Sequence, residues 1–184
     1  MLMQMQTNIQ NIYIDTCFFQ GYLWGKEDEK ENAKDILSKI ESNVRRNPEI
    51  NVRIPFIVVG ELINNLIREN FELRDSDEII YKFFVLRRNL KADIIPPNKC
   101  CYDIAKSLTA QDSYFAENAP TDAFMASCAL CDPDSSHLLT VDSRLLESEL
   151  LKSIEKEIRT ANKRNPQLNN RRVLSLNDNQ SNSF

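Results

Sequence analysis

Hydrophobic residues follow two different spacings along the chain, and the spacing changes several times between one end and the other. Continuous short apolar runs, typical of buried strands, occupy residues 12–19, 52–60, 92–97, 137–141 and 171–176. Between these runs apolar residues recur every third or fourth position, which predicts amphipathic helices at 27–44, 61–70, 79–90, 100–110, 121–131 and 144–161. Ser76 or Asp77 is the expected cap of the third helix.

This alternation of strands and helices predicts an α/β fold with a mostly parallel sheet. Because no internal repeat and no second domain are evident, we expect a single domain over residues 1–176, arranged as a three-layer α/β/α sandwich. The last residues, 177–184 (NDNQSNSF), are a polar C-terminal tail.

Composition narrows the class of protein. With 42% hydrophobic and 27% charged residues, the 184-residue chain is ordinary for a globular domain. It has no apolar run long enough to cross a bilayer and no signal-peptide pattern in MLMQMQTNIQ, so we expect a cytoplasmic protein that does not contact the membrane. Five cysteines, an odd number, predict reduced thiols. A net charge of -4 disfavours a general nucleic-acid coat but allows a local basic patch.

The acidic residues at the ends of strands and the starts of helices indicate the chemistry. Asp15 stands in the apolar run NIYIDTCFF, where an unpaired carboxylate is costly. Asp142 ends the run HLLTVD, Glu61 follows IPFIVVG, and Asp122 begins a helix after Pro120. These positions share one edge of a parallel sheet, where ligands bind at a switch in strand order. Four converging carboxylates would repel each other without a cation, so they predict a Mg²⁺ or Mn²⁺ site.

Each acid also has a simpler interpretation. A helix N-terminus alone would stabilise Asp122, and Glu61 could be an ordinary first-turn glutamate. Asp142, followed by Ser143, could cap the helix at 144–161. Asp15 is the hardest to explain in this way, and the joint placement of the four acids favours the metal site.

Four segments, YIDTCFF, VVGELINNL, TDAFMASCAL and LLTVDSRLL, resemble in this order the four acidic motifs of the PIN domain. The resemblance extends over about Asn11 to Leu176. It implies a Mg²⁺- or Mn²⁺-dependent ribonuclease, and VapC-like members of the family are toxins paired with an antitoxin. Two departures bear on the toxin role more than on nuclease chemistry: Arg144 stands where some members carry a further acid, and extra material lies at residues 71–95 and at the C-terminus.

The resemblance also assigns roles to individual residues. The catalytic and metal-binding acids are expected to be Asp15, Glu61, Asp122 and Asp142, which would activate water for hydrolysis of a phosphodiester bond. Thr16, Thr140 and Ser143 are expected to support these acids or the bound water.

Basic residues are the candidates for RNA contact around an acidic site. The candidate phosphate contacts are Arg45, Arg46, Arg53, Arg68, Arg87, Arg88, Lys91, Arg144 and the basic residues of segment 158–172 (Arg159, Lys163, Arg164, Arg171, Arg172). For each cluster taken alone, a solvated helix face is the simpler interpretation.

Several other features favour packing over chemistry. Cys128 and Cys131 lie on one predicted helix, and the single histidine, His137, enters a strand, so core packing is favoured over zinc binding. Tyr22 and Trp24 could stack a base, although packing is the simpler role. The helices at 27–44 and 78–90 could form a homodimer, bind an antitoxin, or belong to the core.

Three functions are compatible with these features. The first is a metal-dependent endoribonuclease, and the second is a catalytically idle PIN-like module that binds RNA or protein. The third is another α/β protein with an acidic edge, such as a phosphoryl-accepting receiver or a phosphatase. A receiver would need an acidic pair at the end of the first strand, and a haloacid-dehalogenase-type phosphatase would need an aspartate where this chain has Cys17.

Overall fold

The computed structural model describes residues 9–69, 71–162 and 174–175. Within these ranges, five parallel strands form one sheet in the order β3-β2-β1-β4-β5. The strands are β1 (Gln10–Ile14), β2 (Ile50–Pro55), β3 (Asp93–Ile95), β4 (Ser135–Leu139) and β5 (Leu174–Ser175). This confirms the predicted α/β fold with a parallel sheet.

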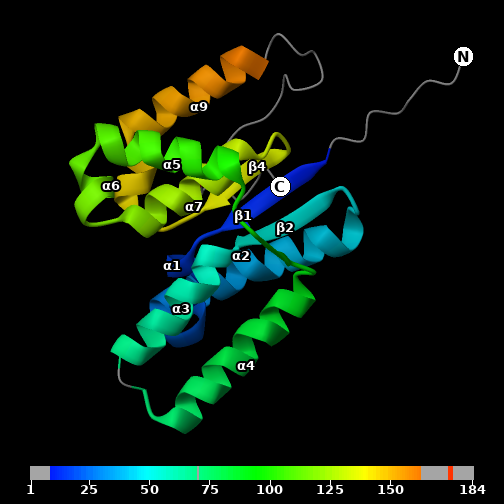
Figure 1. Cartoon of the computed structure of the whole chain (residues 1–184). Coiled ribbons are helices and arrows are strands. Elements are labelled where there is room, and N and C mark those ends of the chain that lie inside the picture. The colour runs from blue at the N-terminus through cyan, green and yellow to red at the C-terminus, as the bar shows by residue number, and fades with distance from the viewer. Residues whose placement is uncertain (1–8, 70, 163–173, 176–184) are drawn as a thin grey trace, which may run out of the picture.

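Helices cover both faces of the sheet. They are α1 (Thr16–Trp24), α2 (Glu27–Arg46), α3 (Phe56–Arg68), α4 (Leu73–Asn89), α5 (Lys99–Gln111), α6 (Ser113–Glu117), α7 (Pro120–Cys131), α8 (Ser143–Glu147) and α9 (Glu149–Asn162). In Figure 1, α2, α3 and α4 lie on one side of the sheet, and α5, α6, α7 and α9 lie on the other. The arrangement is therefore the expected three-layer sandwich. No helix in the described ranges is long and apolar enough to cross a membrane.

The strand order contains one switch point, between β1 and β4. From β1 the chain adds β2 and β3 on one side and then returns to add β4 and β5 on the other. The ends of the two central strands are in register, because Ile14 pairs with Leu139 and the backbone N–H of Asp15 donates to the carbonyl of Leu139 at 2.9 Å. The loops that follow β1 and β4 therefore leave the sheet side by side, where an open α/β sheet binds its ligand.

The core lies between the sheet and its two helical layers. Ile14, Val52, Ile54 and Leu139 from the central strands are fully buried. From the helices, Phe19 packs edge-on against Phe83 of α4, with ring centroids 5.2 Å apart. Strands buried on both faces explain why the sequence shows continuous apolar runs rather than alternation.

The first predicted strand is shorter than expected. Residues 12–19 were predicted as one strand because aromatic and β-branched side chains favour extended structure. Instead β1 ends at Ile14, and the carboxylate of Asp15 caps α1 by accepting from the backbone N–H of Thr16. Aspartate is a strong N-cap residue, and this local bond outweighs the β propensity of the residues that follow.

The prediction of a strand across 52–60 was also wrong in its second half. Pro55 ends β2, and α3 begins at once with Phe56. Glu61 therefore lies in the second turn of α3 and not at the start of a helix. The buried face of α3 consists of Val58, Leu62 and Leu66, whereas Ile63 and Ile67 are 49% and 70% exposed.

Other parts of the helical layers also differ from the predictions. The helix expected at 144–161 is two helices, α8 and α9, separated at Ser148. Helix α4 begins at Leu73, with Glu72 rather than Ser76 or Asp77 at its N-cap, and the short helix α6 was not predicted. Of the last predicted strand, only Leu174 and Ser175 lie within the described residues, and the tail 177–184 lies outside them.

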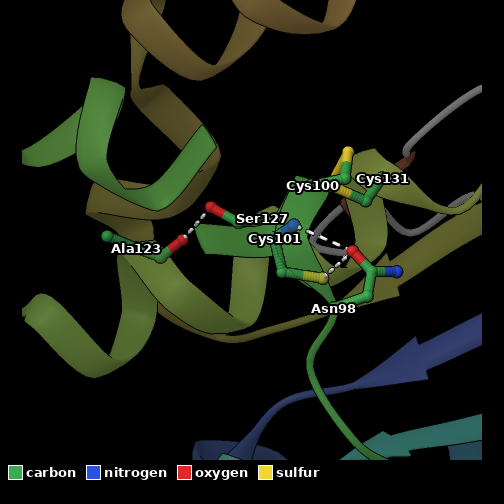
Figure 2. Close-up of a disulfide and its surroundings, with 6 residues drawn as sticks. All are labelled: Asn98, Cys100, Cys101, Ala123, Ser127 and Cys131. Carbon is green, nitrogen blue, oxygen red and sulfur yellow. Dashed lines mark hydrogen bonds between the residues drawn. A yellow bond between two sulfur atoms is a disulfide. The ribbon is translucent and has the colours of Figure 1, made fainter. Parts of the chain in front are cut away.

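A disulfide joins α5 to α7, contrary to the prediction of reduced thiols. Cys100 in the first turn of α5 is bonded to Cys131 at the end of α7, with their Cα atoms 5.9 Å apart (Figure 2). Counting cysteines could not reveal this pair, because only the packing of α5 against α7 brings the two residues together. Within the described residues Cys17, Cys101 and Cys128 remain free thiols, and His137 lies in β4, largely buried.

Candidate active site

The carboxylate of Asp15 is the centre of the site. It is 3% exposed at the end of β1, and three donors hold it: the backbone N–H of Thr16 at 2.6 Å, the hydroxyl of Thr140 at 2.6 Å and the thiol of Cys17 at 2.8 Å. Burial raises the pKa of Asp15, while these hydrogen bonds oppose the rise. The apolar run NIYIDTCFF therefore contains a carboxylate that the fold buries but supplies with donors.

The loop after β4 supplies the second acid. Thr140 directly follows β4, and its hydroxyl donates to Asp15 while accepting from the backbone N–H of Asp142 at 3.0 Å. The carboxylate of Asp142 accepts from the backbone N–H of Arg144 at 2.8 Å and caps α8, which begins at the exposed Ser143. Asp142 is therefore both a helix cap and an acid of this site.

Glu61 reaches the site from α3. Its Oε2 accepts a hydrogen bond of 2.7 Å from the hydroxyl of Thr16, the residue next to Asp15. Burial and the negative charge of Asp15 raise the pKa of Glu61, whereas the hydrogen bond from Thr16 lowers it. A glutamate in the second turn of a helix has no helix-end role, so the simple first-turn interpretation does not apply to Glu61.

Asp122 completes the group from the first turn of α7, where Pro120 is the first helical residue. Burial raises the pKa of Asp122 to about 7, and the negative charges of Asp15, Glu61 and Asp142 contribute to the rise. Each of the other three acids thus acts on Asp122 electrostatically. The topology brings together all four acids that the sequence singled out.

The fit of this group to a metal ion can be tested on its chemistry and on its geometry. Four carboxylates supply the hard oxygen donors that Mg²⁺ and Mn²⁺ prefer, and a cation would relieve the repulsion that raises the pKa of Asp122. Across residues 9–69, 71–162 and 174–175, however, no three His, Cys, Asp or Glu side chains are arranged so that they could hold a metal ion. Protein donors occupy the carboxylates of Asp15, Glu61 and Asp142 instead. The donor set fits a divalent cation, and binding would require these side chains to turn.

The contact between Cys17 and Asp15 was not indicated by the sequence. Besides donating to Asp15, its sulfur lies 3.4 Å from the hydroxyl of Thr140 and accepts from the backbone N–H of Val141 at 3.3 Å. It therefore bridges the loops after β1 and β4. The N-cap role of Asp15 is the feature of the sequence that could have predicted this contact. If Asp15 caps a helix, the residue two positions later lies in the first turn, beside the capping carboxylate.

The structure separates the predicted RNA-binding arginines. Arg144 lies closest to the acids along the chain, exposed on α8, with its guanidinium 4.5 Å from the ring centroid of Tyr114. Arg53 is paired with Asp93 in the sheet, and Arg68 is exposed at the end of α3. Arg87 and Arg88 of α4 line a separate hollow with Lys91.

The remaining basic candidates lie on outer surfaces or outside the described residues. Arg45 and Arg46 end α2, and Arg45 is paired with Glu41. In the C-terminal segment the side chain of Arg159 and the whole of Lys163, Arg164, Arg171 and Arg172 lie outside the described residues.

The fold and the site together define an α/β protein with four carboxylates at the switch point of a parallel sheet. The family model of the PIN domain matches residues 12–150, and the chain belongs to this family. PIN domains are nucleases, and they generally use divalent metal ions.

The fold is also similar to that of a solved structure. A chain of VapBC2 from Rickettsia felis, in a crystal structure bound to a DNA fragment from their promoter, superposes with a TM-score of 0.53. The match covers 90% of this chain and 98% of that chain, at 14% sequence identity, and so concerns the fold alone. No curated protein matches the sequence.

Proposed function

We propose that the protein is a metal-dependent endoribonuclease that hydrolyses phosphodiester bonds in RNA. The observation that carries the proposal is the convergence of Asp15, Glu61, Asp142 and Asp122, in which burial and then the charges of the first three acids raise the pKa of the fourth. Perturbed pKa values of this kind gather at functional sites. The membership of the chain in a family of nucleases supports the same conclusion.

Asp15 and Asp122 would hold the ion, with Glu61 and Asp142 as direct ligands or ligands through water. When bound, Mg²⁺ or Mn²⁺ would promote deprotonation of a water molecule and neutralise the charge that develops on the phosphate. The hydroxyl of Thr140 and the thiol of Cys17 fix Oδ2 of Asp15, and the hydroxyl of Thr16 orients Glu61. These bonds fix where the carboxylates of Asp15 and Glu61 lie before an ion binds.

We further propose that the nuclease is the toxin of a toxin–antitoxin pair, with a second protein as its inhibitor. The similarity of its fold to a VapBC2 chain supports this. Helix α4 exposes Leu73 (81%), Tyr81 (69%) and Phe84 (47%). An apolar face of this kind suits a partner protein or a second copy of the chain.

Replacement of Asp15 by asparagine tests the nuclease proposal. Asn remains a good N-cap, so α1 should still form, but the anionic ligand is lost. We expect Asp15→Asn to abolish Mg²⁺-dependent cleavage of single-stranded RNA while circular dichroism stays unchanged. Asp35→Asn, which changes an exposed acid of α2 paired with Lys39, is the control and should cleave like the parent. Full activity of Asp15→Asn would remove this site from the reaction.

One observation favours the alternative of a catalytically idle PIN-like module. The four acids are not arranged to hold an ion as they stand. Calorimetric titration with Mn²⁺ separates the two functions. Binding that is lost in Asp15→Asn supports the nuclease, and absence of binding in the parent supports the idle module.

A further inference from the structure

A hollow of about 570 Å³ lies between α1 and α2, next to the acidic site. Its floor includes the buried side chains of Phe18 and Ala33. Around it stand an aromatic ring, two side-chain amides and a carboxylate, contributed by Trp24, Gln20, Asn32 and Glu69. The hollow takes no part in the chemistry of the four acids, so its lining needs a separate explanation.

Two residues join this hollow to the acidic site. Cys17 lines it while its sulfur donates to Asp15 at 2.8 Å. Val141 lines it as well, is 50% exposed, and stands between Thr140 and Asp142. A phosphate bound at the acids would therefore have the hollow beside it, on the side of α1.

The chemistry of the lining suits a flat heterocycle. Trp24 is half-buried and packs edge-on against Phe71, with ring centroids 5.9 Å apart. The amide groups of Gln20 and Asn32 can both donate and accept, and the carboxylate of Glu69 accepts only. Unpaired RNA bases are recognised by stacking on aromatic rings together with hydrogen bonds to their edges.

The charge of the lining indicates which part of a nucleotide enters. Among the described residues that line the hollow, Lys26 carries a positive charge, against the carboxylates of Glu29 and Glu69. Glu29 already accepts from the backbone N–H of Lys26 at 2.9 Å. A net charge of about -1 from these groups repels a phosphate but accepts amino groups. Adenine, cytosine and guanine carry an exocyclic amino group, whereas uracil presents carbonyl oxygens in its place.

We propose that this hollow binds one unpaired base of the RNA substrate beside the scissile phosphate, and that it prefers adenine, cytosine or guanine over uracil. The inference rests on the proposed ribonuclease function, whose site it extends. Trp24 supplies the stacking surface, and Glu69 is the acceptor that selects for an amino group.

The chain offers a direct reporter, because Trp24 is its single tryptophan. The parent protein is titrated without divalent metal with single-stranded tetranucleotides of adenosine, cytidine or uridine while tryptophan fluorescence is recorded. We expect quenching by the adenosine and cytidine oligonucleotides, with binding of the uridine oligonucleotide at least about fivefold weaker. Glu69→Gln should reduce this preference. Quenching that is equal for all three would overturn the selectivity, and no quenching by any would overturn the site.

Cleavage kinetics provide the second test. Loss of a stacking ring should raise KM about tenfold in Trp24→Leu, with little change in kcat, while Trp24→Phe should stay close to the parent. Tyr102→Leu is the matched control, since Tyr102 is also a partly exposed ring packed edge-on against a phenylalanine, Phe124 at 4.9 Å, outside the hollow. An equal rise in KM for Tyr102→Leu would overturn the role of Trp24.

The outcomes for the hollow and for the nuclease proposal are separable. Selective quenching in a protein that cleaves no RNA would support the hollow and refute the ribonuclease. Cleavage without quenching would support the ribonuclease and refute the hollow. Quenching by a tetra-arginine peptide but by none of the oligonucleotides would also refute a base site, because it would assign the hollow to a basic protein partner.

Discussion

The disulfide between Cys100 and Cys131 allows a prediction whose magnitude follows from the fold. It joins the first turn of α5 to the last residue of α7 across 31 positions of the chain. In the chain-entropy model, closing a loop of this length restricts the unfolded state enough to stabilise the protein by about 3.7 kcal/mol. A loss of this size should lower Tm by roughly 7–15 °C for a chain of this length.

The perturbation is Cys100→Ser, compared with the parent protein under oxidising conditions. Cys100 is exposed, so the new hydroxyl group remains in water and adds no burial cost of its own. Urea denaturation followed by circular dichroism gives the difference in free energy of unfolding. The control repeats urea denaturation of the parent and of Cys100→Ser with a dithiol reductant. The reduced parent should then have the same free energy of unfolding as Cys100→Ser.

The result that would refute this reasoning is specific. If mass spectrometry shows the disulfide in the parent, yet Cys100→Ser loses less than about 1 kcal/mol, loop closure does not stabilise the protein as the model requires. If the difference persists in reductant, the serine itself is the cause. If the oxidised parent contains two free thiols at these positions, the packing of α5 against α7 differs from that in Figure 2.

Two further predictions concern the acidic site. Because the folded pKa of Asp122 is about 7, above its ordinary 3.8, the metal-free fold should lose stability as the pH rises from about 4 to 7. Asp122→Asn should remove the part of this loss that Asp122 causes, while the raised pKa values of Asp15 and Glu61 leave the rest. Near pH 8 the free energy of unfolding of the variant should exceed that of the parent by about 2 kcal/mol, a value discounted for partial exposure. Near pH 4 the two should agree, as urea denaturation at both pH values would show. Thr140→Val, which loses the 2.6 Å bond to Asp15, should weaken Mn²⁺ binding about 10- to 100-fold by calorimetry. Thr140→Ser keeps the donor and should bind like the parent, and equal loss in both variants would contradict this role.

The sequence predicted the elements better than their boundaries. The sequence predicts the strand β1 but not its end at Ile14. The residues from Thr16 to Phe19 favour extended structure, whereas the cap at Asp15 begins a helix. Glu61 was expected at a helix start because the apolar run 52–60 favours one strand, whereas β2 ends at Pro55 and α3 begins at Phe56. Residue propensity decides neither case, since the N-cap bond of Asp15 begins α1 and Pro55 ends β2.

Strand order makes the meeting of two of the four acids predictable, whereas Glu61 and Asp122 reach the site from helices α3 and α7. The carboxyl ends of parallel strands share one edge, so Asp15 and Asp142 meet in any fold that places β1 beside β4. The partners of these acids were less predictable. The bond from Cys17 to Asp15 depends on the helical geometry of the first turn, and the disulfide depends on how two helices pack. Neither distance has a signature in residue spacing.

The helix-cap interpretation and the metal-site interpretation of these acids turn out to be compatible. Asp15 caps α1, Asp142 caps α8, and Asp122 lies in the first turn of α7. The N-terminus of a helix carries a partial positive charge and free N–H groups, which stabilise a carboxylate. The fold can therefore bring several negative charges to one edge of the sheet before any cation binds. Glu61 has no such support from a helix end, and its bond from Thr16 takes that role. Capping thus stabilises a group of carboxylates in the folded protein. The remaining repulsion among them contributes to the raised pKa of Asp122, and a divalent ion would relieve it.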